Sequence, residues 1–167
     1  MTPVRRRDLV VLAAGLALAA WLLVRSWYGS LPSLDWWLPA PLAVLAVAEA
    51  LAARTLRARL AAQRAARAGR APRAGEEVRL VEPMLVARLA VLAQASAYVG
   101  AVFAGVWAGV LAHVGPAVDR LQAAGSDTVT AVIGVVGSAA LVAAALWLEH
   151  VCRIPPDEDE PPRGVVA

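Results

Sequence analysis

The sequence predicts an all-α, polytopic integral membrane protein with four transmembrane helices packed as a small bundle. Three observations support this fold class: 60% of the 167 residues are hydrophobic, the mean hydropathy is +0.62, and four long apolar segments recur along the chain. Soluble domains contain about 45 to 50% apolar residues, so a soluble fold is disfavoured. The apolar runs are rich in Ala and Leu and lack strand-like alternation, which favours helices.

Residues 9–53 form the first predicted hairpin. A helix that crosses a bilayer core of about 30 Å needs about 20 mostly apolar residues. We expect the first helix at about 9–28 and the second at about 38–53, beginning at Pro39 or Pro41, where a missing N–H costs no hydrogen bond. A cleaved signal peptide is the alternative for the first segment, but its Ala-x-Ala triplet at 17–19 lies inside the apolar run.

Residues 84–150 form the second predicted hairpin. Its helices are expected at about 84–114, opened by Pro83 and ended by Gly115, and at about 128–148, with Ser126 or Asp127 as the N-cap. The remaining segments are expected in the cytoplasm: a basic N-terminus at 1–8, an Arg-rich stalk and loop at 54–83 whose first half extends the second helix, and an acidic, Pro-rich tail at 151–167.

The orientation follows from the arginines, which supply all sixteen basic residues. Thirteen of them lie in the three segments 1–8, 54–83 and 151–167, whereas the opposite loops hold only Arg25 and Arg120. By the positive-inside rule, both termini lie in the cytoplasm and the chain is a multi-pass protein of the cell (inner) membrane. An aromatic belt is expected on the outer side, formed by Trp27, Tyr28, Trp36 and Trp37.

Polar residues near the inner ends of three predicted helices form a candidate intramembrane cluster. Charged groups inside spans are costly and mark functional sites by default. We expect Arg88 to pair with Glu49 or Glu149, because an unpaired charge there is more costly than a neutral residue. Snorkelling or a purely structural pair is the alternative to proton or ion handling. The candidate cluster is Glu49, Arg88, Gln94 and Glu149.

Small residues recur at helical spacing on the third helix and, to a lesser extent, on the fourth. Such faces let two helix backbones approach closely. Packing within one chain is favoured over oligomerisation. The candidate packing residues are Ala97, Gly100, Ala101, Gly105, Gly109, Gly134 and Ser138.

Known catalytic motifs are not found: the sequence has no phosphate-binding loop, no G-x-S-x-G and no H-E-x-x-H. His113 and His150 are expected at opposite faces of the membrane, and Cys152 is the single cysteine. We therefore expect no enzymatic activity, no cofactor, no metal site and no nucleic-acid partner.

The leading functional hypothesis is a non-enzymatic scaffold or accessory subunit. Its partners are the lipid bilayer and a membrane-protein partner or a second copy of the chain, with Arg57, Arg64 and Arg67 as candidate contacts to anionic lipid or protein. The simpler explanation is that those arginines only set the topology of the chain and are solvated by water. The alternative function is a small transporter or proton-coupled carrier that uses Glu49 and its inner-leaflet neighbours.

Five stretches of the sequence carry a family resemblance: R-R-R-D-L-V-V-L-A-A-G at 5–15, W-L-L-V-R at 21–25, R-L-A-V-L-A-Q-A-S-A at 88–97, G-A-V-F-A-G-V-W-A-G at 100–109 and L-E-H-V-C-R-I-P-P at 148–156. The sequence is similar to the small actinobacterial membrane proteins grouped as domain of unknown function 3180. The resemblance implies a polytopic inner-membrane protein without an assigned activity, often encoded near folate-biosynthesis genes. It also implies a basic residue at the position of Gln94, from which this chain departs.

Overall fold

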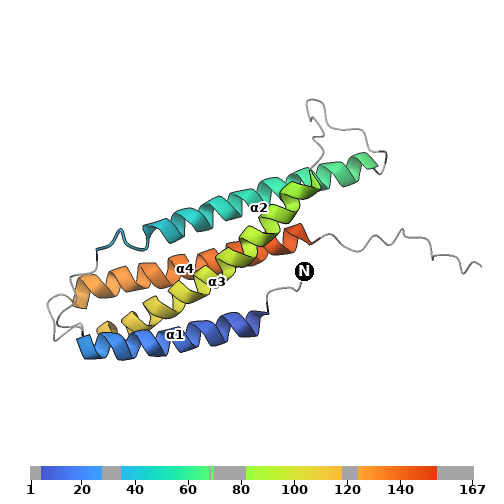
Figure 1. Ribbon diagram of the computed structural model, residues 1–167. Coiled ribbons are helices and arrows are strands. Elements are labelled where there is room, and N and C mark those ends of the chain that lie inside the picture. The colour runs from blue at the N-terminus through green and yellow to red at the C-terminus, as the bar shows by residue number, and fades with distance from the viewer. Residues whose placement is uncertain (1–4, 28–34, 68, 70–81, 118–123, 154–167) are drawn as a thin grey trace, which may run out of the picture.

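Four α-helices make up the computed structural model, which describes residues 5–27, 35–67, 69, 82–117 and 124–153. The fold is all-α, as the sequence predicts (Figure 1). Tyr28, residues 68 and 70–81 of the stalk and loop at 54–83, and most of the tail at 151–167 lie outside the described residues. The helices are α1 (Arg6–Trp27), α2 (Ala40–Arg67), α3 (Pro83–Val114) and α4 (Ala124–Cys152), and a 3-10 turn, η2 (Gly115–Ala117), follows α3.

The helices lie side by side in an order that differs from their order along the chain. The central helix α3 packs on both α1 and α4, and α2 packs on the other side of α4 (Figure 1). At one end, the first turns of α3 also reach α2, where Leu56, Leu89 and Leu148 pack together. The helices α1 and α2, expected to form a hairpin, therefore pack on different partners.

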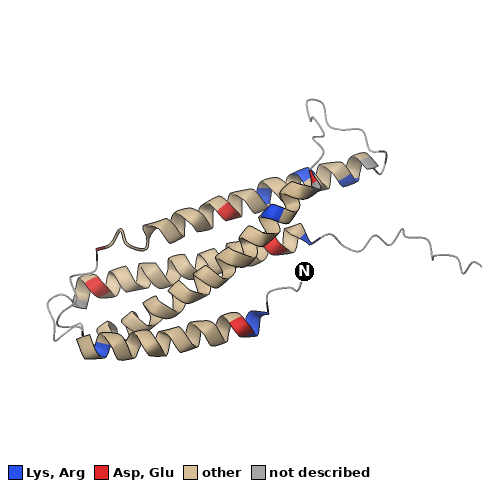
Figure 2. Ribbon diagram, viewed as in Figure 1, with Lys and Arg blue, Asp and Glu red and all other residues tan. Residues whose placement is uncertain are grey.

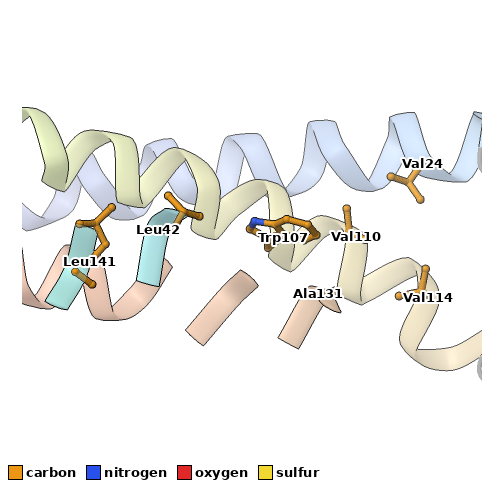
Figure 3. Packing of buried hydrophobic residues seen from close by; sticks show 8 residues of the cluster. Val24, Leu42, Trp107, Val110, Val114, Ala131 and Leu141 are labelled. Atoms are coloured by element: carbon orange, nitrogen blue, oxygen red, sulfur yellow. The ribbon is translucent and has the colours of Figure 1, made fainter. Parts of the chain in front are cut away.

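The core is a series of small clusters along this row of helices. The largest contains Trp107 and Val110 of α3, which pack against Val24 of α1 and Leu42 of α2 (Figure 3). Leu141 of α4 is fully buried in the same cluster. The core thus joins all four helices through α3 and α4.

Local sequence signals set most of the helix ends. Pro83 occupies the first turn of α3, and the helix ends at the residue before Gly115, as expected. The second helix begins at Ala40 and continues to Arg67, so the predicted stalk is helical. The predicted N-cap of the fourth helix is wrong, because α4 already begins at Ala124. Asp127 instead lies within its first turn, where a carboxylate favourably meets the positive end of the helix dipole.

Among the described residues, three helices are long and apolar enough to cross a membrane: α1, Met84–Val114 within α3 and Gly125–Cys152 within α4. These helices indicate a membrane protein. The helix α2 does not meet this standard, because Glu49, Arg54 and Arg57 interrupt its apolar part. The structure therefore supports three of the four expected spans.

Candidate functional site

Charged residues gather at one end of the row of helices. The start of α1, the second half of α2, the start of α3 and the end of α4 all lie at this end (Figure 2). At the opposite end lie the last turn of α1, which contains Arg25, and the first turn of α4, which contains Asp127, and Asp35 precedes α2 (Figure 1). We call the first end the arginine end. Its described arginines are Arg5, Arg6, Arg7, Arg54, Arg57, Arg59, Arg64, Arg67, Arg88 and Arg153.

Glu49 is the most unusual polar residue of α2. It is 2% exposed, and neither carboxylate oxygen has a hydrogen-bond partner in the described part of the chain. Ser96 of α3 is also buried and faces the Glu49 carboxylate, but no hydrogen bond of good geometry joins the two side chains. The expected pairing of Glu49 with Arg88 is not formed, because Arg88 lies on an exposed face of α3. Gln94 is half-buried, on the same helix.

Glu149 has a partner in the residue that directly follows its helix. The Nη2 atom of Arg153 donates to Oε1 of Glu149 at 3.0 Å, one helical turn away. The Glu149 side chain is 7% exposed, whereas that of Arg153 is 54% exposed. The ion pair therefore lies at the surface of the arginine end. The partner of Glu149 in this pair is Arg153, whereas the sequence predicted Arg88.

Two glycines of α3 lie directly against the backbone of α1. A Cβ atom added at Gly105 would meet the Ala13 carbonyl and lie 3.0 Å from the Cβ of Leu16. One added at Gly109 would meet the Ala17 carbonyl, and it would lie 2.9 Å from the backbone nitrogen of Trp21. Backbone atoms cannot rotate away, so only glycine permits this approach.

Small residues also join α3 to α4. A Cβ atom at Gly100 would lie 2.7 Å from Cγ2 of Val142, and one at Gly134 would meet the indole ring of Trp107. Ser138 is fully buried and donates a hydrogen bond to the Gly134 carbonyl at 2.7 Å. The structure also buries Ala97 and Ala101. The predicted packing residues thus form two interfaces, one with α1 and one between α3 and α4.

An open apolar groove runs between α2 and α4. Its volume is about 690 Å³. Sequence reasoning missed this groove, although the run of small residues in both helices is the signal that could have found it. Its lining residues are Ala43, Ala46, Val47, Ala50, Val132, Ile133, Val136, Gly137, Ala140, Ala143, Ala144 and Trp147.

The sequence profile of the family described as "Protein of unknown function (DUF3180)" matches residues 9–156. The matched range includes all four helices apart from the first turn of α1. The chain belongs to the DUF3180 family. Comparison with the curated proteins and with the solved structures finds no match to this DUF3180 protein.

The metal-binding residue types of this DUF3180 chain are dispersed. His113 ends α3 at one end of the row, whereas His150 lies near the end of α4 at the arginine end. Cys152 is buried in the cluster with Leu56 and Leu148. Within the described ranges, no three His, Cys, Asp or Glu residues are placed to hold one metal ion.

Proposed function

We propose that this DUF3180 protein is a non-enzymatic scaffold or accessory subunit of the cell (inner) membrane. It crosses the bilayer four times, with both termini in the cytoplasm. The arginine end lies on the cytoplasmic side, where the positive-inside rule places arginine-rich segments. At this end the protein meets a membrane-protein partner or anionic lipid.

The geometry of α2 supports a fourth span. From Ala40 to Arg57 the helix rises about 26 Å, close to the bilayer core of about 30 Å. Its outward side carries the exposed apolar residues Val44, Val47 and Leu51, which suit a lipid environment. Arg54 reaches the headgroups by extending its side chain along the helix. Lateral packing against α4 then shields Glu49 from lipid.

The observation that carries the scaffold proposal is the contrast between the middle of the row and the arginine end. The middle is packed through glycine and alanine against backbone, as at Gly105 and Gly109, and most charged residues of the described ranges lie at the arginine end. Carriers place polar binding sites near the bilayer midplane, commonly at interrupted helices. The buried, unpaired Glu49 is the observation that favours a proton-coupled carrier as the second candidate.

Affinity purification from native membranes followed by mass spectrometry tests the proposal. We expect a reproducible partner at fixed stoichiometry, whose recovery falls in Arg64→Gln. Arg25→Gln, at the opposite end of the row, serves as the matched control with the same change in charge. A partner-free protein that moves a solute across liposomes, and loses that activity in Glu49→Gln, would instead establish the carrier.

A further inference from the structure

The groove between α2 and α4 continues into a line of positive charge. Ala43, Val47 and Ala50 line the groove on α2. Their spacing of four and three residues extends to Arg54 and Arg57, so all five positions lie along one face of the helix. Both arginines are exposed. Along α2, the apolar lining of the groove is therefore followed on the same face by two exposed arginines.

We propose that this groove binds one acyl chain of an anionic phospholipid, whose phosphate lies between Arg54 and Arg57. The inference rests on the proposed insertion of α2 with its arginine end in the cytoplasm. Guanidinium groups bind phosphate oxygens with two parallel hydrogen bonds, which gives a stronger contact than a single donor. The bound lipid belongs to the inner leaflet.

The dimensions of the groove match a lipid of one leaflet. From Ala43 to Arg54 the helix rises about 16 Å, which is about half of a 30 Å bilayer core. The volume of about 690 Å³ lies within the range of small-molecule sites, roughly 300 to 1,000 Å³. The small residues Gly137 and Ala140 leave the α4 side of the groove open. Trp147 also lines the groove. An aromatic ring near the headgroup level is typical of membrane interfaces.

Charge is what distinguishes a phospholipid from a second copy of this chain as the occupant. A second copy would offer the same arginines at the same membrane depth, because both copies share one topology. Like charges would then face each other at the end of the groove. An anionic phosphate instead complements Arg54 and Arg57.

Native mass spectrometry of the delipidated full chain tests the proposal. The protein is titrated with dioleoyl phosphatidylglycerol and, separately, with dioleoyl phosphatidylcholine, which share acyl chains and differ in charge. We expect one phosphatidylglycerol per chain, bound more tightly than phosphatidylcholine. Arg57→Gln is expected to weaken phosphatidylglycerol binding about fivefold, the factor that corresponds to one arginine near an anionic surface. Binding of phosphatidylcholine is expected to remain unchanged in this variant.

Matched variants separate the two parts of the site. Arg59 lies two residues after Arg57, about 200° around the helix, so Arg59→Gln removes the same charge without affecting the lipid. Ala140→Leu fills the groove and weakens both lipids, whereas Ala139→Leu adds the same bulk at an exposed position outside the lining. Circular dichroism checks that each variant keeps its helical content.

Three results would overturn the proposal: equal affinity for the two lipids, equal effects of Arg57→Gln and Arg59→Gln, or a dimer that Ala140→Leu dissociates without changing lipid binding. The last result identifies a second copy as the occupant. These failures are distinct from a failure of the proposed function. The proposed function stands if position 59 is cytoplasmic and a partner is recovered at fixed stoichiometry. In that case, equal affinities for the two lipids reject the lipid site and leave the proposed function in place.

Discussion

Replacing Gly109 by alanine tests the contact between α1 and α3. The added Cβ atom would meet the Ala17 carbonyl and lie 2.8 Å from the Cβ of Ala20. Because one of these obstacles is backbone, relief requires a shift of α1 away from α3. Overpacking of this kind costs about 1 to 3 kcal/mol. The higher helix propensity of alanine offsets about 1 kcal/mol of that cost.

Gly15→Ala is the matched control, because nothing lies within 4 Å of a Cβ atom added at Gly15 of α1. Both substitutions carry the same gain in helix propensity, so the difference between their free energies of unfolding isolates the steric cost. We expect Gly109→Ala to be less stable than Gly15→Ala by about 1 to 3 kcal/mol. The assay is unfolding in detergent micelles by increasing dodecyl sulfate, followed by circular dichroism. Equal stability of the two variants would refute the close approach of α1 and α3.

Three further predictions use the same unfolding assay. Gly134→Ala is expected to lower stability less in a Trp107→Leu background, with a coupling free energy above about 0.5 kcal/mol, because the added Cβ atom meets the indole ring; strictly additive effects would contradict this contact. Glu49→Gln is expected not to lower stability, because both carboxylate oxygens lack a described partner; a loss of about 3 kcal/mol would reveal a buried pair. Arg153→Gln is expected to cost only about 0.3 to 0.5 kcal/mol and to cost less at high salt, because its pair with Glu149 is partly exposed; an effect that is independent of salt would show a different role.

Helix ends were predictable where a residue restricts the local backbone. Pro83 and Gly115 bound α3 as expected, because proline suits the first turn of a helix and the 3-10 turn begins at Gly115. The start of α4 was not predictable in this way. Ser126 and Asp127 are good capping residues, but they also tolerate the first helical turn, so a cap preference alone does not locate the boundary.

Contacts between helices depend on rotation and order, which local patterns do not determine. The small face of α3 predicted close packing, but a small face accepts any neighbouring helix, so the assignment of Gly105 to α1 and Gly100 to α4 required the structure. Arg88 illustrates the same point. The sequence places it near the depth of Glu49, but in the structure Glu49 faces Ser96, about two helical turns further along α3, and Arg88 lies on an exposed face. The relative depth of residues on two helices and the rotation of each helix about its axis both depend on the packing of the whole row.

Cysteine accessibility tests most directly whether α2 crosses the membrane. In a Cys152→Ser background, single cysteines are placed by Asp35→Cys, before α2, and by Arg59→Cys, on its exposed second half. A membrane-impermeant maleimide applied to intact cells is expected to label position 35, and to label position 59 only after permeabilisation. Labelling of both positions from outside, or of neither, would place the two ends of α2 on one side of the membrane and contradict the four-span topology.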